Sequence, residues 1–264
     1  MSVVGWGTME FKTELIGGRL IKRYKRFLAD VTLDTGEEIT AHVANPGAMT
    51  GLKEPGSKVW LSISDNPKRK LKYSWELIEP EGFSQVIPLV GVNTAHPNGV
   101  VAEAIEAGAI KELLDYATLR REVKYGEKSR IDILLQDVAE GVVENVTKTK
   151  DSVSKPTKPP CYVEVKSVTL MREAGLAEFP DAVTARGSKH LEELSNMVRE
   201  GARAVMLYLI QRTDADQFSI AGDIDPKYAQ AFEMARAAGV EMLVYDCNIT
   251  ASSIDLGREI PISI

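Results

Sequence analysis

The sequence is poor in cysteine, since only Cys161 and Cys247 occur among its 264 residues. Neither belongs to a C-x-x-C pair or to a Cys/His metal spacing, which argues against a zinc module and a disulfide-stapled fold. Both cysteines lie in apolar, strand-like surroundings. We therefore interpret them as small core residues.

The chain also lacks a long apolar run, and no segment is long enough to span a bilayer. The stretch Met1–Met9 has neither the basic n-region nor the apolar h-region of a signal peptide. We therefore expect a cytoplasmic protein with no membrane association. A Gly-rich phosphate loop, a dinucleotide fingerprint and a Ser-His-Asp ordering are absent as well, so nothing favours nucleotide-dependent or serine-hydrolase chemistry.

Charge is distributed unevenly along the chain. The net charge of −6 argues against a protein that coats nucleic acid uniformly. Residues 1–85, however, carry 12 of the 32 basic and 11 of the 38 acidic residues, so the acidic excess lies in the remainder. Two basic clusters interleave with aromatic residues, and they consist of Arg19, Lys22, Arg23, Lys25 and Arg26, then Lys68, Arg69, Lys70 and Lys72. These clusters predict salt-sensitive contacts with backbone phosphates.

Five short β-prone runs separated by turn formers occupy the first part of the chain. They are Arg19–Tyr24, Phe27–Leu33, Glu38–Val43, Lys58–Ser64 and Lys72–Ile78. This spacing predicts a five-stranded barrel of the OB type in a domain of residues 1–85. Such barrels are frequent platforms for nucleic acid, although a barrel used only for packing or protein contact stays an alternative.

Residues 86–264 have a different pattern of apolar residues, in which helical and strand periodicities alternate. Helices are predicted over Asn98–Gly108, Thr184–Glu200 and Asp225–Gly239, and strands over Thr118–Tyr125, Arg130–Leu135, Cys161–Leu170, Ala204–Ile210 and Glu241–Tyr245. The order is that of restriction-endonuclease-like folds, which have an αβββαβ core, so we predict an α/β fold, α+β overall. The polar segment 140–160 predicts a flexible insertion.

Acidic residues and a lysine mark neighbouring strands of this second domain. In an extended strand Glu164 and Lys166 project from one face, and Asp132 lies on the preceding strand. Two carboxylates from adjacent strands suit Mg²⁺ or Mn²⁺, with substrate phosphate completing the shell. Lys166 would then lie beside the attacking water. A solvated strand face with a cross-strand ion pair is the competing interpretation.

Two further groups of side chains are candidates for the same site. Glu103 lies on the first predicted helix, where it could reach the metal or be solvated. Arg186, Lys189 and His190 fall in the first turns of the Thr184 helix, whose N–H groups also face outward. They could jointly hold a phosphate, or they could be solvated bases on a capped helix.

Several long segments resemble the sugar fermentation stimulation protein family, SfsA, over nearly the whole chain. They are Leu20–Asp30, Ser64–Glu76, Glu122–Asp132, Val163–Leu170, Phe179–Leu194 and Ile224–Ala229. The resemblance implies an N-terminal OB-like domain, a C-terminal PD-(D/E)-x-K nuclease-like domain and DNA as the partner. It carries the nuclease-like positions onto Asp132, Glu164 and Lys166, with Glu103 as an additional acid. The chain departs from the family at Val43–Gly47, where the family usually has a cysteine before an Asn-Thr-Gly turn.

Three functions remain open at this point. The first is a Mg²⁺-dependent DNA endonuclease in which Asp132 and Glu164 ligate the metal. The second is a non-catalytic DNA-binding regulator of sugar (maltose-type) metabolism genes on the same fold. The third is a small-molecule or protein-binding module, which the acidic net charge favours. A homo-oligomer is compatible with each of them.

Overall fold

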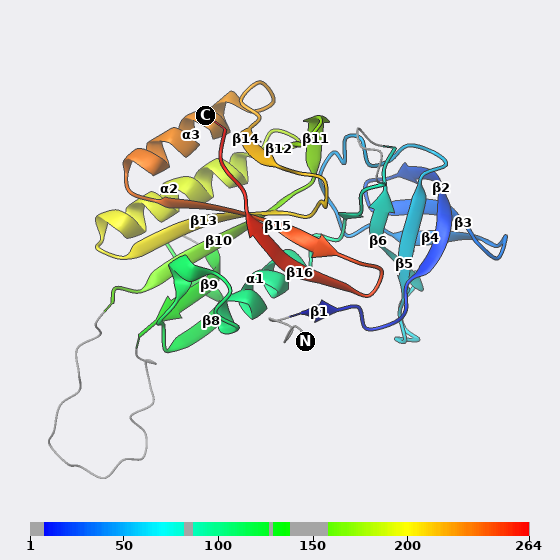
Figure 1. Cartoon of the computed structure of the whole chain (residues 1–264), viewed down its shortest axis with the longest axis horizontal. Coiled ribbons are helices and arrows are strands. Elements are labelled where there is room, and N and C mark those ends of the chain that lie inside the picture. The colour runs from blue at the N-terminus through cyan, green and yellow to red at the C-terminus, as the bar shows by residue number, and fades with distance from the viewer. Residues whose placement is uncertain (1–7, 82–86, 127–128, 138–157, 264) are drawn as a thin grey trace, which may run out of the picture.

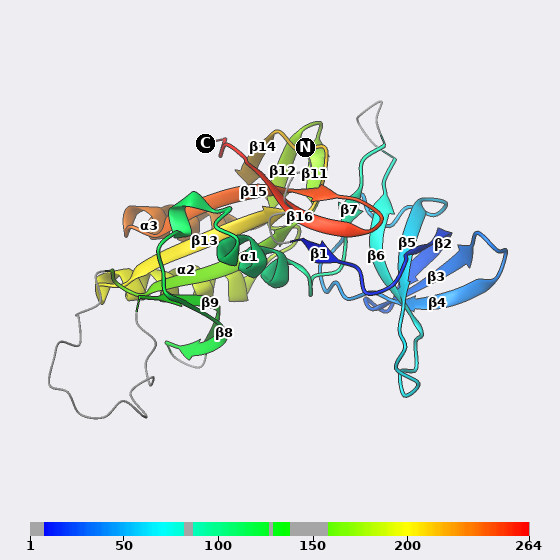
Figure 2. The same ribbon diagram turned by 60° about the horizontal axis from the view of Figure 1, so that its bottom comes forward.

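The structure is a computed structural model that describes residues 8–81, 87–126, 129–137 and 158–263. It contains a small β-barrel and a larger α/β domain, and the barrel lies beside one end of the larger domain in both ribbon views (Figures 1 and 2). The flexible insertion predicted over 140–160 lies outside the described residues except for its last three positions.

The barrel has the five strands that the sequence predicts. They are β2 (Ile16–Tyr24), β3 (Leu28–Leu33), β4 (Glu38–His42), β5 (Lys58–Ile63) and β6 (Tyr73–Glu79). Neighbouring strands pair in the order β4-β3-β2-β5-β6, and a parallel pairing of β4 with β6 closes the barrel. Its interior is filled by side chains that alternate along the strands, such as Ala29, Val31 and Leu33 on β3. The OB-like prediction is therefore confirmed.

Two short strands cross the boundary predicted at residue 85. Strand β1 (Met9–Glu10) precedes the barrel in sequence, yet it pairs with β16 (Ser253–Glu259) of the larger domain. Strand β7 (Val90–Gly91) follows the barrel and pairs with β6 inside its sheet. Strand β1, from the segment before the barrel, thus joins the sheet of the larger domain, and β7, from the segment after it, joins the barrel sheet. These pairings tie the two units together.

A seven-stranded sheet forms the centre of the larger domain, with the order β1-β16-β15-β13-β10-β9-β8. Its main strands are β8 (Thr118–Tyr125), β9 (Ser129–Gln136), β10 (Cys161–Val168), β13 (Arg203–Ile210) and β15 (Glu241–Ile249). Strands β10, β13 and β15 are parallel and covered on both faces, which explains why β13 is apolar and buried from Ala204 to Ile210. A smaller sheet of β11 (Leu170–Glu173), β12 (Leu176–Phe179) and β14 (Gln217–Ile220) flanks it.

In the described part of the chain, three α-helices cover the two faces of the large sheet. Helix α1 (Pro97–Glu106) packs on one face, and α2 (Ala185–Arg199) and α3 (Pro226–Ala237) pack on the other, so the sheet lies between two apolar clusters. A short 3₁₀ helix spans Lys111–Leu113. The side chains of Thr184 and Asp225 cap α2 and α3 by accepting backbone N–H bonds. Within the described residues, no helix combines the length and the apolar character needed to cross a membrane.

The third strand predicted for the larger domain ends earlier than the sequence pattern suggested. We predicted one strand over Cys161–Leu170, but β10 ends at Val168 and β11 begins at Leu170 in the smaller sheet. The apolar pattern continues through this break because Val168 and Leu170 are both buried. A pattern of burial alone does not mark the residue at which a chain leaves one sheet for another.

Candidate active site

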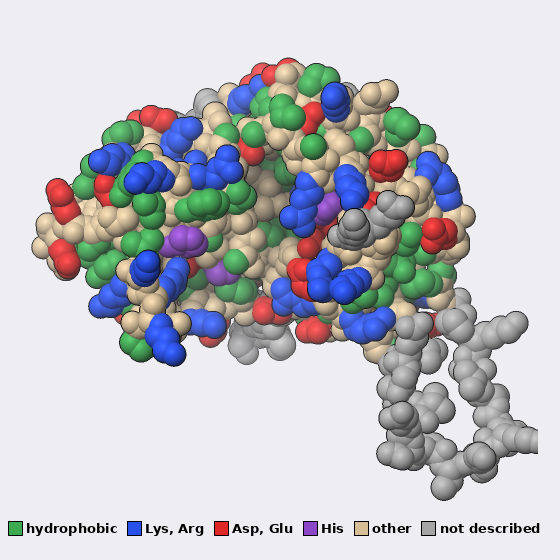
Figure 3. Space-filling model, turned by 180° about the vertical axis from the view of Figure 1, so that it is seen from behind, with side chains coloured by type: hydrophobic (Ala, Val, Ile, Leu, Met, Phe, Trp, Pro, Cys, Tyr) green, Lys and Arg blue, Asp and Glu red, His purple; other side chains and the backbone are tan. Residues whose placement is uncertain are grey.

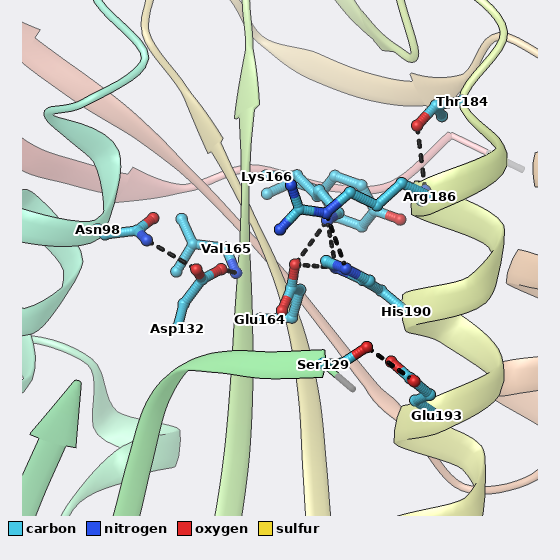
Figure 4. A network of polar contacts seen from close by, with 12 residues as sticks. Asn98, Ser129, Asp132, Glu164, Val165, Lys166, Thr184, Arg186, His190 and Glu193 are labelled. Atoms are coloured by element: carbon cyan, nitrogen blue, oxygen red, sulfur yellow. Dashed lines mark hydrogen bonds and ion pairs between the residues drawn. The ribbon is translucent and has the colours of Figure 1, made fainter. Parts of the chain in front are cut away.

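The site forms where strands β9 and β10 separate. They pair antiparallel from Cys161 and Leu135 to Val163 and Ile133. Beyond that point the backbone N–H of Val165 donates a hydrogen bond of 2.8 Å to Oδ2 of Asp132, a side chain on β9. Asn98 on α1 donates to the other carboxylate oxygen of Asp132 at 2.7 Å. Asp132 is therefore held between α1 and the backbone of β10 (Figure 4).

Glu164 lies on the α2 side of β10 and is almost fully buried, with 2% of its surface exposed. Its Oε1 accepts a hydrogen bond of 2.7 Å from Nζ of Lys166 and a second, short one from the His190 ring. Its Oε2 is buried and has no hydrogen-bond partner in the described part of the chain. One buried oxygen of Glu164 is thus left for a ligand.

Three polar contacts surround the His190 ring, from Arg186, Glu164 and Lys166. Arg186 lies one helical turn earlier on α2, and its Nε donates to Nε2 of His190 at 3.2 Å. Because an arginine can only donate, Nε2 accepts there, and the Glu164 carboxylate on the other side favours the proton on Nδ1. Nζ of Lys166, 3.1 Å from Nδ1, then directs its N–H bond to Glu164. The Nδ1–H group then donates to Oε1 of Glu164. A directed chain consequently runs from Arg186 through His190 to Glu164.

The two carboxyl groups have different electrostatic environments. Burial, together with the negative charge of Glu164, raises the pKa of Asp132 to about 6. Burial would also raise the pKa of Glu164, but hydrogen bonds from His190 and Lys166 outweigh it and hold that pKa below the usual value. Glu164 is thus kept ionised, and Asp132 carries the electrostatic penalty of the pair.

The carboxylate oxygens at this site are ligands that suit a hard divalent cation. Burial and the charge of Glu164 both raise the pKa of Asp132, and a bound cation would offset both effects. The unpartnered Oε2 of Glu164 is a ready oxygen ligand. The described residues contain no group of three or more His, Cys, Asp or Glu side chains that could hold a metal. The remaining coordination positions would therefore belong to a backbone oxygen, water or substrate phosphate, as Mg²⁺ tolerates well.

The structure places Glu103 away from this pair. Glu103 lines a cavity of about 540 Å³ together with Glu76 and His96, between the barrel and α1. It follows Asn98 by five residues, about 140° around the helix. It is Asn98 that α1 brings to Asp132, a contact that our sequence analysis did not anticipate. An asparagine in the first turn of a helix gives no sequence signal for such a role.

The basic residues of α2 divide into two groups. Arg186 is exposed and joins the site through His190. Lys189 instead forms an ion pair of 3.4 Å with Glu193, which also accepts a hydrogen bond of 2.8 Å from Ser129. Lys166 and His190 therefore contact Glu164 directly, and Arg186 contacts His190 (Figure 4).

Several residues of the first basic cluster of the barrel make hydrogen bonds or an ion pair within the protein. Arg23 donates to the backbone oxygens of Asn45, Gly47 and Ala48 at 2.9 to 3.3 Å. Arg19 donates to Gly56, and Lys22 lies 3.5 Å from Asp30. Lys25 and Arg26 are exposed at the turn between β2 and β3.

The second cluster lies on the hairpin between β5 and β6. Lys68 and Lys70 are exposed there, and Arg69 donates to Ser74 at 2.7 Å. Seen from behind, lysine and arginine side chains gather on both domains around a hollow between them (Figure 3). The tertiary structure thus sets basic side chains of the barrel and of the larger domain on one face.

Comparison with known proteins assigns the family. Residues 95–253 match the family model described as "Sugar fermentation stimulation protein RE domain", and residues 21–87 match "SfsA N-terminal OB domain". The chain belongs to the SfsA family. A "Sugar fermentation stimulation protein homolog" of Rhodospirillum centenum is 54% identical over 97% of this chain and all of its own length. One from Maricaulis maris is 51% identical, over 97% of this chain and 99% of the relative.

A solved SfsA structure has the same fold. SfsA of Pyrococcus furiosus, determined in complex with Ca²⁺, superposes with a TM-score of 0.80 and covers 97% of this chain and 98% of its own. Its sequence is 24% identical to this one. The architecture of the SfsA family is therefore retained at low sequence identity.

Proposed function

We propose that this SfsA protein binds DNA and carries a divalent-metal-dependent phosphodiesterase site in its larger domain. The observation that carries the proposal is the buried, unpartnered Oε2 of Glu164 close to Asp132, with Lys166 and Arg186 beside it. The recorded Ca²⁺ complex of the Pyrococcus furiosus relative supports a divalent cation in a protein of this fold. The metal proposed here is Mg²⁺ or Mn²⁺.

Asp132 and Glu164 would hold the ion. When bound, it supplies positive charge to the phosphate and lowers the pKa of a bound water molecule. Asn98 and the N–H of Val165 keep the Asp132 carboxylate in place, and His190 does the same for Glu164. The site is thus preorganised by neighbours from two helices and one strand.

Lys166 and Arg186 would act on the phosphodiester. Lys166 is mostly buried and is fixed by its bond to Glu164, so its ammonium group can steady negative charge that develops on the phosphate or the water. Arg186 is exposed on the first turn of α2, where its guanidinium can bind a phosphate oxygen. The basic residues of the barrel would hold the DNA backbone and make its affinity salt-dependent.

Calorimetric titration with Mn²⁺ tests the metal site without a choice of substrate. We expect the wild type to bind Mn²⁺, and Asp132→Ala and Glu164→Ala to lose that binding. Glu103→Ala removes a carboxylate of the same domain that lines a separate cavity, so it should retain binding. Equal binding by all four proteins would contradict the proposed site.

Catalysis needs a second measurement. In a nicking assay on supercoiled plasmid with Mn²⁺, we expect turnover by the wild type and none by Lys166→Met. Lys166→Met should still bind Mn²⁺, because it leaves both carboxylates in place. DNA retention with no Mn²⁺ binding and no nicking by the wild type would instead indicate a non-catalytic regulator of sugar-metabolism genes.

A further inference from the structure

The turn between β2 and β3 has a backbone conformation that its residues disfavour. Lys25 and Arg26 are consecutive, and their φ angles are 47° and 64°. Residues other than glycine, asparagine and aspartate rarely adopt this left-handed backbone region, and hairpin turns of this kind favour Asn-Gly. Both residues are exposed, so packing does not explain their presence. A strained turn that carries two cations indicates a binding role for those cations.

Phe27 follows the two cations and is exposed to 44%. Of the large hydrophobic side chains that are exposed in the described residues, only that of Phe27 is aromatic. Its backbone is nevertheless fixed, because its N–H donates to Lys25 at 2.7 Å and its carbonyl accepts from Val43 at 2.9 Å. A rigid backbone therefore presents an aromatic ring to solvent beside two positive charges.

This turn is connected to the candidate active site through the loop of residues 45–49. Arg23 on β2 holds three carbonyls of the loop, and Asp181 of the larger domain accepts the N–H of Met49 at 3.1 Å. Asp181 comes shortly before α2, which carries Arg186. The loop thus bridges the barrel turn and the helix at the site.

A cleft lies between this loop and the larger domain. It has a volume of about 130 Å³ and is lined by Asn45 and Gly47 of the barrel loop and by Ser167, Thr169 and Asp181 of the larger domain. Ser167 follows Lys166 on β10 and its side chain points to the opposite face of the strand, so the cleft reaches the strand that carries Glu164 and Lys166. The space-filling view shows a hollow between the two domains with basic side chains on either side (Figure 3).

We propose that the Lys25–Arg26–Phe27 turn binds an unpaired nucleotide, and that a single strand runs from it along the cleft toward Asp132 and Glu164. This inference rests on the proposed function and names its substrate class. An exposed ring can stack on the face of a base only when that base is unpaired, and the adjacent cations bind the flanking phosphates. The turn therefore selects single-stranded nucleic acid over duplex.

Fluorescence anisotropy with the full-length protein tests the inference in EDTA, where metal-dependent cleavage cannot occur. The probes are a labelled strand of about 15 nucleotides, near the site size of an OB-type barrel, and its matched duplex. Phe27→Ser should weaken single-strand binding about ten-fold and leave duplex binding and the salt slope unchanged. Met234→Ser, which alters an exposed apolar side chain on α3, is the matched control and should change neither.

A second variant separates binding from folding. Arg26→Gly relieves the left-handed backbone, so the melting temperature should rise by about 2 °C. The same variant removes a phosphate contact and should reduce the single-strand salt slope by about 0.7. A more stable protein that binds the strand more weakly is a result that a purely structural turn would not give.

The outcomes separate this inference from the proposed function. Single-strand binding by Phe27→Ser equal to that of the wild type, or equal losses for strand and duplex, would overturn the inference even if the wild type nicks plasmid. Conversely, loss of single-strand binding in Phe27→Ser by a protein that neither binds Mn²⁺ nor nicks DNA would support the inference and overturn the catalytic proposal alone.

Discussion

The backbone N–H of Val165 donates a hydrogen bond to Oδ2 of Asp132 at 2.8 Å. Val165 is the residue between Glu164 and Lys166, and at this point β9 has stopped pairing with β10. The carboxylate thus takes the place of the missing strand partner. As a result, the position of one acid is fixed by the backbone of the strand that carries the other acid.

Asp132→Asn should stabilise the metal-free protein above neutral pH. Folding raises the pKa of Asp132 from 3.8 to about 6, through burial first and then the charge of Glu164. The folded protein therefore binds this proton more tightly than the unfolded chain does, so the wild type loses stability as pH rises from about 4 to about 6. We expect the variant to be more stable by about 2 kcal/mol at pH 8, and by much less at pH 4.

Urea denaturation in EDTA at the two pH values measures this difference. Asp65→Asn, which alters an exposed carboxylate on the β5–β6 hairpin, is the control and should change stability little at either pH. A stabilisation by Asp132→Asn that is the same at pH 4 and pH 8 would show that the charge of Asp132 is not its cause.

His190→Ala should weaken Mn²⁺ binding although His190 is not proposed as a ligand. His190 donates to Oε1 of Glu164 and thereby orients the carboxylate. Loss of such a supporting hydrogen bond reduces metal affinity by about 10-fold to 100-fold. Calorimetry should show this reduction, whereas Lys189→Ala on the same helix should retain the wild-type affinity.

The same substitution should lower stability in the absence of metal. Glu164 is buried, and removal of His190 leaves Lys166 as its remaining hydrogen-bond donor. We expect a loss of about 2 kcal/mol in the free energy of unfolding, measured by urea denaturation in EDTA. Unchanged stability together with unchanged Mn²⁺ affinity would contradict the positioning role of His190.

Arg23→Ala should destabilise the fold rather than only reduce DNA binding. Its guanidinium donates hydrogen bonds to the carbonyls of Asn45, Gly47 and Ala48, which would lose this partner. A cost of about 1–3 kcal/mol is expected in thermal or urea denaturation. Arg19→Ala, which removes one exposed bond to Gly56, should cost much less.

The double change Lys68→Ala and Lys70→Ala should weaken the binding of all duplexes similarly. Both side chains are exposed on the β5–β6 hairpin, and phosphate contacts carry no sequence information. The slope of log K against log salt should become shallower by about 1.8, close to 0.9 for each lost contact. Lys227→Ala on α3 should leave the slope unchanged, and an unchanged slope in the double variant would remove the hairpin from the DNA interface.

Much of the secondary structure could be predicted because its causes are local. Strand β8 spans Thr118–Tyr125 as predicted, and α2 spans Ala185–Arg199, within one residue of the predicted Thr184–Glu200 at each end. Alternation of apolar residues, capping side chains and turn formers act within a few residues of each other. The strand order of the second domain then suggested that Asp132, Glu164 and Lys166 belong to one site, and the structure places them together.

The sequence by itself thus determined the elements, the two kinds of domain and the carboxylates from neighbouring strands. Only the tertiary structure decided that Asn98 holds Asp132, that Arg23 anchors the loop of residues 45–49, and that β1 joins the sheet of the other domain. These contacts join residues far apart in the chain, and they depend on how the barrel, the helices and the sheet pack. A side chain's partner is set by that packing, because any exposed arginine or asparagine has the same local pattern before the chain folds.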